Sequence, residues 1–140
     1  MTRDEMLDVV VRWQEALARH DLEAFTRLYA ETAVLESPVA GSVTGRIAIM
    51  NVTMTLLSAF PDRIMSFEPP VIDGDRAAIG ATVTGTHMGA FMGLPPTGKK
   101  FRFSLVYLLV VRNGQIVHDR RVYDFKGFLV QLGLLKAKPV

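Results

Sequence analysis

The chain has 140 residues, with 16 Lys and Arg, 14 Asp and Glu, and no cysteine. This length favours a single domain covering residues 1–140, and a net charge of +2 with scattered basic residues argues against a nucleic acid or an acidic membrane as partner. The missing cysteine excludes disulfides and thiolate chemistry, and without a signal-like or membrane-spanning apolar stretch we expect a cytoplasmic protein.

Three amphipathic helices are expected before Pro61. Thr2 and Glu5 form a capping box, and apolar residues then recur at helical spacing as far as Leu17. Asp21 can cap a second helix, whose apolar stripe consists of Leu22, Phe25, Leu28 and Tyr29. Pro61 ends the third helix, whose expected inner face consists of Ile47, Met50, Met54 and Leu57.

Strands dominate the rest of the chain. The expected strands are residues 32–36, 64–67, 76–86, 100–111 and 115–124, and a short helix at residues 125–132 follows them. Helices followed by strands with short turns indicate an α+β fold with an antiparallel or mixed sheet. The strand at residues 76–86 is rich in Ala and Gly, which permits the sheet to curve strongly over a hollow.

The turn at residues 113–114 decides which side chains of the last two long strands share a face. A two-residue turn places Tyr107 opposite Arg120 and on the same face as His118. A three-residue turn with a glycine bulge pairs Tyr107 with Asp119 instead. The two forms place different residues in the candidate site: one directs His118 and Arg120 to the face of the pocket, and the other directs Asp119 and Arg121 there.

We favour the bulged form, because it puts Tyr107, Arg121 and Tyr123 on one face and sets Asp119 and Arg121 into an apolar wall. Such a wall is typical of a cavity in which a few polar groups orient a ligand. These four polar residues are the catalytic candidates. Seven further residues are candidates for contact with a ligand: Trp13, Tyr29, Met50, Met54, His87, Phe91 and Phe103.

Plainer roles remain open for several of these residues. Asp119 and Arg121 also fit an ion pair on a solvated strand, and His87 fits a loop hydrogen bond as well as a pocket. Asp124 fits the N-cap of the closing helix better than a catalytic role. Core packing is the favoured alternative for Trp13, Tyr29, Met50 and Met54. No sequence pattern for a metal or an organic cofactor is found, so neither is expected.

Three segments in the C-terminal half resemble the SnoaL-like polyketide cyclase family. They are GTHMGAFMGLPPTG at residues 85–98 with the Lys-Lys-Phe that follows, NGQI at residues 113–116, and YDFKGFLVQLG at residues 123–133. The resemblance implies the cone-shaped α+β fold shared with ketosteroid isomerase, in which three helices pack on a bent sheet around a cavity. It also implies an intramolecular aldol condensation without a metal or organic cofactor.

Two positions depart from the pattern that this resemblance implies. In the family, the aspartate that acts as the general base lies three residues before the aspartate of the Asp-Phe pair, and Arg121 occupies that position here. A guanidinium cannot act as a base at neutral pH. The family's pocket histidine on the preceding strand corresponds to Tyr107. The resemblance therefore supports the fold more strongly than the activity.

Three functions fit these residues. The first is a cofactor-free cyclase or isomerase for a hydrophobic, oxygenated small molecule, with Asp119 as substitute base and Arg121, Tyr107 or Tyr123 polarising a carbonyl. The second is a non-catalytic binding protein in which Arg121 pairs with an acidic group of the ligand. The third resembles the limonene epoxide hydrolases, which activate water with an Asp-Arg-Asp set, but Glu36 is the only candidate for its third member.

The outer side of the sheet is also expected to be apolar. Val106, Leu108 and Val110 alternate with apolar residues that face inward. A strand that is apolar on both sides usually needs covering. We therefore expect a homodimer that forms through the outer face of the sheet.

Overall fold

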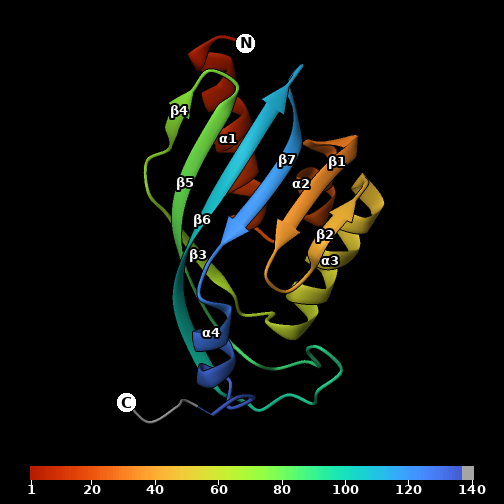
Figure 1. The fold of residues 1–140 in the computed structure, drawn as a ribbon, viewed down its shortest axis with the longest axis vertical. Coiled ribbons are helices and arrows are strands. Elements are labelled where there is room, and N and C mark those ends of the chain that lie inside the picture. The colour runs from red at the N-terminus through yellow and green to blue at the C-terminus, as the bar shows by residue number, and fades with distance from the viewer. Residues whose placement is uncertain (137–140) are drawn as a thin grey trace.

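The computed structural model describes residues 1–136, and these residues form the expected α+β fold (Figure 1). Its helices are α1 (Arg3–Ala18), α2 (Leu22–Arg27), α3 (Arg46–Ala59) and α4 (Phe125–Gln131). Its strands are β1 (Tyr29–Ser37), β2 (Gly41–Thr44), β3 (Ile64–Phe67), β4 (Val71–Asp73), β5 (Arg76–Thr86), β6 (Lys100–Arg112) and β7 (Gln115–Val122). No helix among the described residues is long and apolar enough to cross a membrane.

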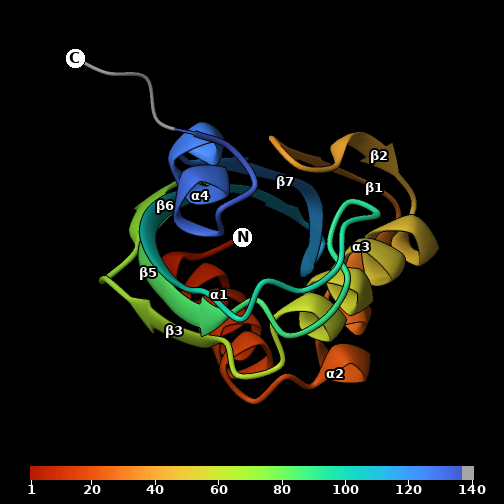
Figure 2. The same ribbon diagram turned by 90° about the horizontal axis from the view of Figure 1, so that it is seen from below.

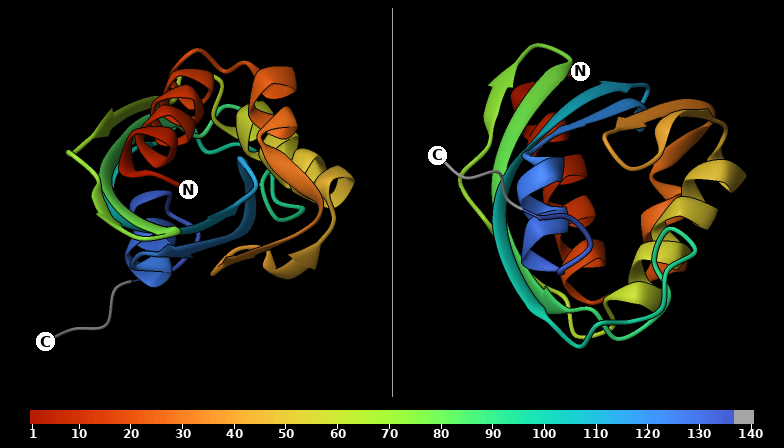
Figure 3. Two further views of the ribbon diagram at one scale, coloured as in Figure 1. Left: turned by 90° about the horizontal axis from the view of Figure 1, so that it is seen from above. Right: turned by 60° about the horizontal axis from the view of Figure 1, so that its bottom comes forward.

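The strands form one mixed sheet with the order β2-β1-β7-β6-β5-β3, and β4 also pairs with β5. Neighbouring strands are antiparallel, except that β1 and β7 run parallel. Figures 2 and 3 show the sheet bending around α1, while α2 and α3 pack beside β1. The short helix α4 packs against β6.

The helix caps that the sequence indicates are present. Thr2 and Glu5 form the capping box of α1, and Asp21 accepts a hydrogen bond from the backbone N–H of Ala24 at the start of α2. Asp124 caps α4 in the same way. Asp124 is therefore held in a structural role, as expected.

The boundary between α2 and the first strand differs from the expectation. Tyr29 begins β1 instead of extending the stripe of α2, and the expected strand at residues 32–36 is longer at both ends. The reason is tertiary, because Arg46 Nε donates to the backbone oxygen of Tyr29 at 2.8 Å and Ile116 N–H donates to that of Leu28 at 2.8 Å. The short strands β2 and β4 were not expected.

The buried face of α3 also differs from the expectation. Its buried residues are Ile49, Thr53 and Ala59. Ile47 is 72% exposed and Met54 is 45% exposed, so the expected inner face is wrong. Arg46 is the only charged residue of this helix, so the apolar pattern does not single out one side. The N–H of Gly45, the N-cap residue, donates to the backbone oxygen of Ala33 at 2.8 Å and fixes where the helix begins against β1.

The hairpin between β6 and β7 combines a two-residue turn with a bulge. Asn113 and Gly114 have φ angles of 53° and 76°, the left-handed conformation that a tight hairpin turn requires. The register then shifts between Val110 and Val111, which leaves Val117 without a partner on β6. The bulge therefore lies in the strand and not in the turn.

This bulge places Tyr107 opposite Arg121, so neither of the two expected pairings is correct. The side chains that we expected to face inward nevertheless do so. Tyr107, Asp119 and Arg121 are buried on the inner side, whereas His118 and Arg120 are directed outward. One extra residue in the strand has the same effect on the faces as the expected extra residue in the turn.

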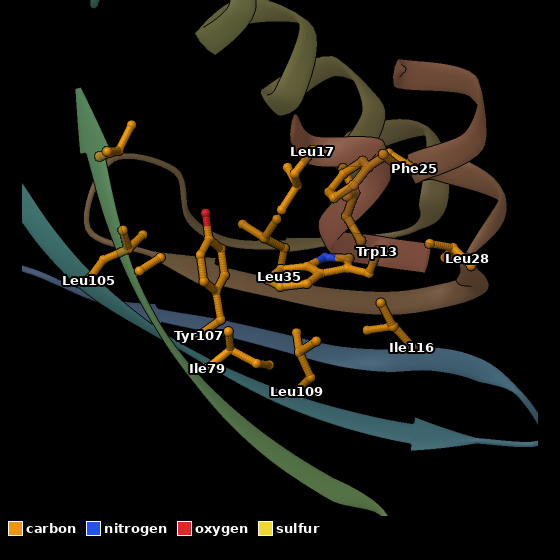
Figure 4. Close-up of a cluster of buried hydrophobic side chains, with 14 of the residues drawn as sticks. Trp13, Leu17, Phe25, Leu28, Leu35, Ile79, Leu105, Tyr107, Leu109 and Ile116 are labelled. Atoms are coloured by element: carbon orange, nitrogen blue, oxygen red, sulfur yellow. The ribbon is translucent and has the colours of Figure 1, made fainter. Parts of the chain in front are cut away.

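Two clusters of aromatic side chains fill the space inside the sheet. In the first, the Trp13 indole meets the Tyr107 ring edge-on at 4.7 Å, and Figure 4 shows both rings between α1 and the sheet. In the second, Phe60 lies at the end of α3 and contacts Phe91, Phe101 and Phe128. The cleft described next is bounded by residues of both clusters.

Candidate functional site

A cleft opens on the inner side of the sheet, between α3, α4 and the strands. Its empty volume is about 500 Å³ with the open mouth included, and the part that can hold the centre of a water molecule is about 50 Å³. Its apolar lining consists of Val39, Leu56, Phe60, Met65, Val83, Phe101, Phe103, Leu105 and Phe128. Its polar lining consists of Ser37, Arg63, Tyr107, Arg121 and Tyr123. An apolar cleft with a few polar groups is the usual form of a small-molecule site.

Arg121 is fixed in this cleft by a buried ion pair. Its Nη2 lies 3.1 Å from Oδ2 of Asp119, and its Nε lies 3.3 Å from Oδ1. The exposed fraction of the side chain is 8% for Arg121 and 0% for Asp119. Burial alone would lower the pKa of Arg121, but the attraction and hydrogen bonds of Asp119, together with Tyr107 and Tyr29, outweigh it and raise that pKa above its usual range. Arg121 therefore carries its charge inside an apolar wall.

A second layer of hydrogen bonds holds Asp119 from behind. The Tyr29 hydroxyl donates to Oδ2 of Asp119 at 2.5 Å, and Nε1 of Trp13 donates to the Tyr29 oxygen at 3.0 Å. Burial, followed by the charge of Asp119, raises the pKa of Tyr29 well above its ordinary value. Tyr29 therefore keeps its proton and remains a donor to the carboxylate.

This arrangement makes Asp119 the buried counter-charge of Arg121. Both of its oxygens already accept hydrogen bonds, and it is not among the residues that line the cleft. Its carboxylate holds the Arg121 guanidinium in place. The placement argues against Asp119 as a base in contact with a substrate.

Tyr107 and Tyr123 line the cleft as expected and supply neutral hydroxyl groups. The guanidinium carbon of Arg121 lies 5.2 Å from the centre of the Tyr107 ring. Burial raises the pKa of Tyr107, although Arg121 and Arg63 act in the opposite direction. Burial also raises the pKa of Tyr123 to about 12, and its ring stacks on Phe103 at 4.9 Å.

Arg63 is a cleft residue that the sequence interpretation missed. Its backbone is fixed from two sides, because its oxygen accepts from Nε2 of His20 at 2.7 Å and its N–H donates to Phe60 at 3.1 Å. Its side-chain Nε is buried and has no hydrogen-bond partner among residues 1–136. The alternation of β3 carried a signal, since Arg63 is in phase with the inward-facing Met65 and Phe67.

The other predicted ligand contacts lie apart from the cleft, with one exception. Phe103 lines it. Trp13 and Tyr29 are buried behind Asp119. Met50 is half-buried and Met54 is exposed on α3, and neither lines the cleft. The favoured alternative of core packing is thus met by Trp13 and Tyr29 but not by Met54.

His87 and Phe91 belong to the aromatic cluster around Phe60, outside the cleft lining. Nδ1 of His87 accepts a hydrogen bond from the Thr97 N–H at 3.2 Å, so it ties together the two ends of the loop between β5 and β6. Of the two roles open for His87, the structure shows the loop hydrogen bond.

Glu36 does not supply a third inward carboxylate. Its Oε2 lies 3.0 Å from Nε2 of His118 on the outer side of the sheet. The cleft lining formed by the described residues contains no carboxylate and no imidazole. Within residues 1–136, no group of three His, Asp or Glu residues is placed to hold a metal ion. The set of groups expected for epoxide hydrolysis is therefore not assembled.

Known proteins share both the sequence pattern and the fold. A model of the SnoaL-like polyketide cyclase family matches residues 7–132. The chain is 41% identical over 49 residues to nogalonic acid methyl ester cyclase of Streptomyces nogalater, a match that covers 35% of this chain and only 37% of that enzyme.

Two solved structures are similar over nearly the whole chain. AclR of Streptomyces galilaeus, a proposed hydroxylase, is 29% identical with a TM-score of 0.84, and the match covers 99% of this chain and 87% of AclR. IdmH of Streptomyces antibioticus, a proposed polyketide cyclase, is 32% identical with a TM-score of 0.76, and the match covers 91% of this chain and 98% of IdmH. The family match, the shared fold and the apolar cleft agree, and the chain belongs to the SnoaL-like polyketide cyclase family.

Proposed function

We propose that the protein is a cofactor-free enzyme that binds a hydrophobic, oxygenated small molecule of the polyketide type and stabilises its enolate. The observation that carries this proposal is Arg121, a guanidinium that lines an apolar cleft and is held there by the fully buried Asp119. Membership of a family of polyketide cyclases supports the substrate class. The name of the curated relative, a cyclase of a methyl ester, also supports it.

The chemistry follows from the placement of charge. A carbonyl oxygen of the ligand lies against Arg121 and accepts a hydrogen bond from Tyr107. When a proton leaves the carbon next to that carbonyl, the negative charge that develops on the oxygen is stabilised by the guanidinium in a water-poor site. The described residues of the cleft offer no carboxylate or imidazole, so the proton passes to solvent water at the open mouth of the cleft, directly or through an oxygen of the substrate.

A proton-exchange assay tests this proposal. The probe is a neutral aromatic keto ester, ethyl benzoylacetate, and NMR follows the loss of its acidic C–H signal in mildly acidic D2O. We expect exchange faster than in buffer alone, and a loss of about 10²–10³ in rate for Arg121→Met, the usual effect of removing an oxyanion-stabilising group. Arg27→Met is the matched control, because this side chain is 73% exposed on α2, apart from the cleft lining and from the outer face of the sheet.

Two results would contradict the proposal. One is an Arg121→Met variant that is folded by circular dichroism and exchanges as fast as the wild type. The other is a wild-type protein that binds the keto ester without accelerating exchange. The second result would instead favour a non-catalytic binding protein, an alternative supported by the lack of a carboxylate or imidazole in the described cleft lining.

We also propose that a second copy of the chain covers the outer face of the sheet. Val106, Leu108 and Val122 are 40%, 36% and 48% exposed there, and these values are high for large apolar residues on central strands. Light scattering should give twice the chain mass at micromolar concentration, and Leu108→Glu should give a folded monomer. A monomeric wild type would contradict this proposal.

The cytoplasmic location that we expect from the sequence stays a prediction.

A further inference from the structure

The cleft contains more positive than negative charge. Arg121 and Arg63 both line it, whereas Asp119, the carboxylate that pairs with Arg121, is outside the lining and is already shared by Arg121 and Tyr29. No carboxylate of residues 1–136 forms an ion pair with Arg63. One guanidinium of the cleft thus lacks a counter-charge among the described residues.

An uncompensated charge in an apolar site is costly, and an anionic ligand relieves that cost. Arg63 is half-buried, and this burial lowers its pKa; Tyr107 opposes the shift, and the positive charge of Arg121 adds to it. The buried Nε of Arg63 is a hydrogen-bond donor without a partner among the described residues. Arg63 therefore has both the charge and an unused donor with which to bind a carboxylate.

The two arginines reach the cleft from opposite sides of β6. Arg121 lies on β7, while Arg63 precedes β3, which pairs with β5 on the other side of β6. Against the larger effect of burial, the charges of both arginines lower the pKa of Tyr107 on β6. Apolar side chains such as Phe103 line the rest of the cleft. A ligand that satisfies both arginines thus needs two oxygen-bearing groups joined by an apolar body.

We infer that the ligand is a hydrophobic keto acid, whose carboxylate binds Arg63 while its ketone oxygen is held by Arg121. This inference rests on the proposed function and narrows its substrate class to a free acid. It separates this chain from nogalonic acid methyl ester cyclase, whose name specifies a methyl ester. Arg63 then acts as the residue that selects the acid over the ester.

A matched pair of probes tests the inference. The probes are 4-oxo-4-phenylbutanoic acid and its methyl ester, which share the aromatic ketone and differ in charge. Titration calorimetry at low salt should show that the wild type binds the acid at least about tenfold more tightly than the ester, as expected for a charge-assisted bidentate contact. In Arg63→Met this preference should disappear, because the acid loses affinity toward that of the ester.

Two further variants keep the test decisive. Arg102→Met removes an exposed arginine of β6 and should keep the full preference for the acid. Arg63→Lys keeps the positive charge but loses the planar guanidinium group, so it should keep part of the preference for the acid. This variant also tests the inference if Arg63→Met fails to fold.

Equal affinity of the wild type for acid and ester would overturn the inference, as would a folded Arg63→Met that still prefers the acid. Either result leaves proton exchange in the neutral keto ester untouched, and that exchange tests the proposed function separately. Failure of the wild type to bind either probe contradicts the inference as well.

Discussion

The replacement Asp119→Asn is the sharpest test of how the cleft is built. Asp119 is fully buried and accepts hydrogen bonds from Tyr29 at 2.5 Å and from two nitrogens of Arg121 at 3.1 and 3.3 Å. Asparagine keeps the shape, but it removes the negative charge and turns one accepting oxygen into a donor that faces other donors. Arg121 is left charged and nearly enclosed.

Breaking a buried ion pair from one side costs about 3–5 kcal/mol of folding free energy. With a urea m-value of about 2 kcal/mol/M, that loss lowers the unfolding midpoint by about 1.5–2.5 M. The only tryptophan, Trp13, donates a hydrogen bond to Tyr29 in the same network, so its fluorescence reports unfolding at this site.

Glu36→Gln is the matched control, because it breaks the pair between Glu36 and His118 on the neighbouring strand. That pair is 43% and 37% exposed, so its loss should cost less than about 1 kcal/mol. A loss below about 1 kcal/mol for Asp119→Asn, or equal losses for the two variants, would refute the view that Asp119 holds Arg121 as a buried counter-charge.

Three further predictions concern buried side chains and their effect on stability. Ile49→Ala should cost about 2–5 kcal/mol in urea unfolding and Ile47→Ala less than about 0.5, because only Ile49 is buried on α3; similar losses would contradict the observed helix face. A Cβ at Gly85 would lie 2.8 Å from the Phe101 ring, so Gly85→Ala should lose about 1–3 kcal/mol; Gly80→Ala, which meets only a flexible glutamate, should lose less. All three tyrosines have pKa values raised by burial, so stability is full below pH 10 and should fall by up to about 4 kcal/mol per pH unit above it; phenolate absorbance near pH 10 in folded protein would oppose this.

The sequence predicted the fold well, because its strongest signals are local. The capping residues Thr2, Asp21 and Asp124 all cap the helices that they were expected to cap. The apolar stripe of α1 is buried as its spacing indicates. The face of α3 could not be predicted in this way, because that helix is apolar on several sides and its orientation is set by contacts with β1.

The candidate site was only partly predictable. Arg121, Tyr107 and Tyr123 line the cleft, and the inward direction of Asp119 was expected from the favoured face. Asp119 does not line the cleft, because the longer Arg121 side chain pairs with its carboxylate. An alternating strand pattern gives the face of a residue but not such a pairing. Distant elements also meet at the cleft, and this is why Arg63, which precedes a four-residue strand, was missed.

The unpaired Val117 gives β7 an unusual tolerance to a change in length. In a central strand, loss of one residue normally turns every later side chain to the opposite side of the sheet. Here the residues on either side of Val117 already pair with adjacent positions of β6. Deleting Val117 should therefore straighten the strand and leave Asp119 and Arg121 facing inward. Family members that are one residue shorter at this point are expected to present the same pair of charges. A one-residue gap at position 117 in a sequence alignment should therefore not be taken as a change in the site.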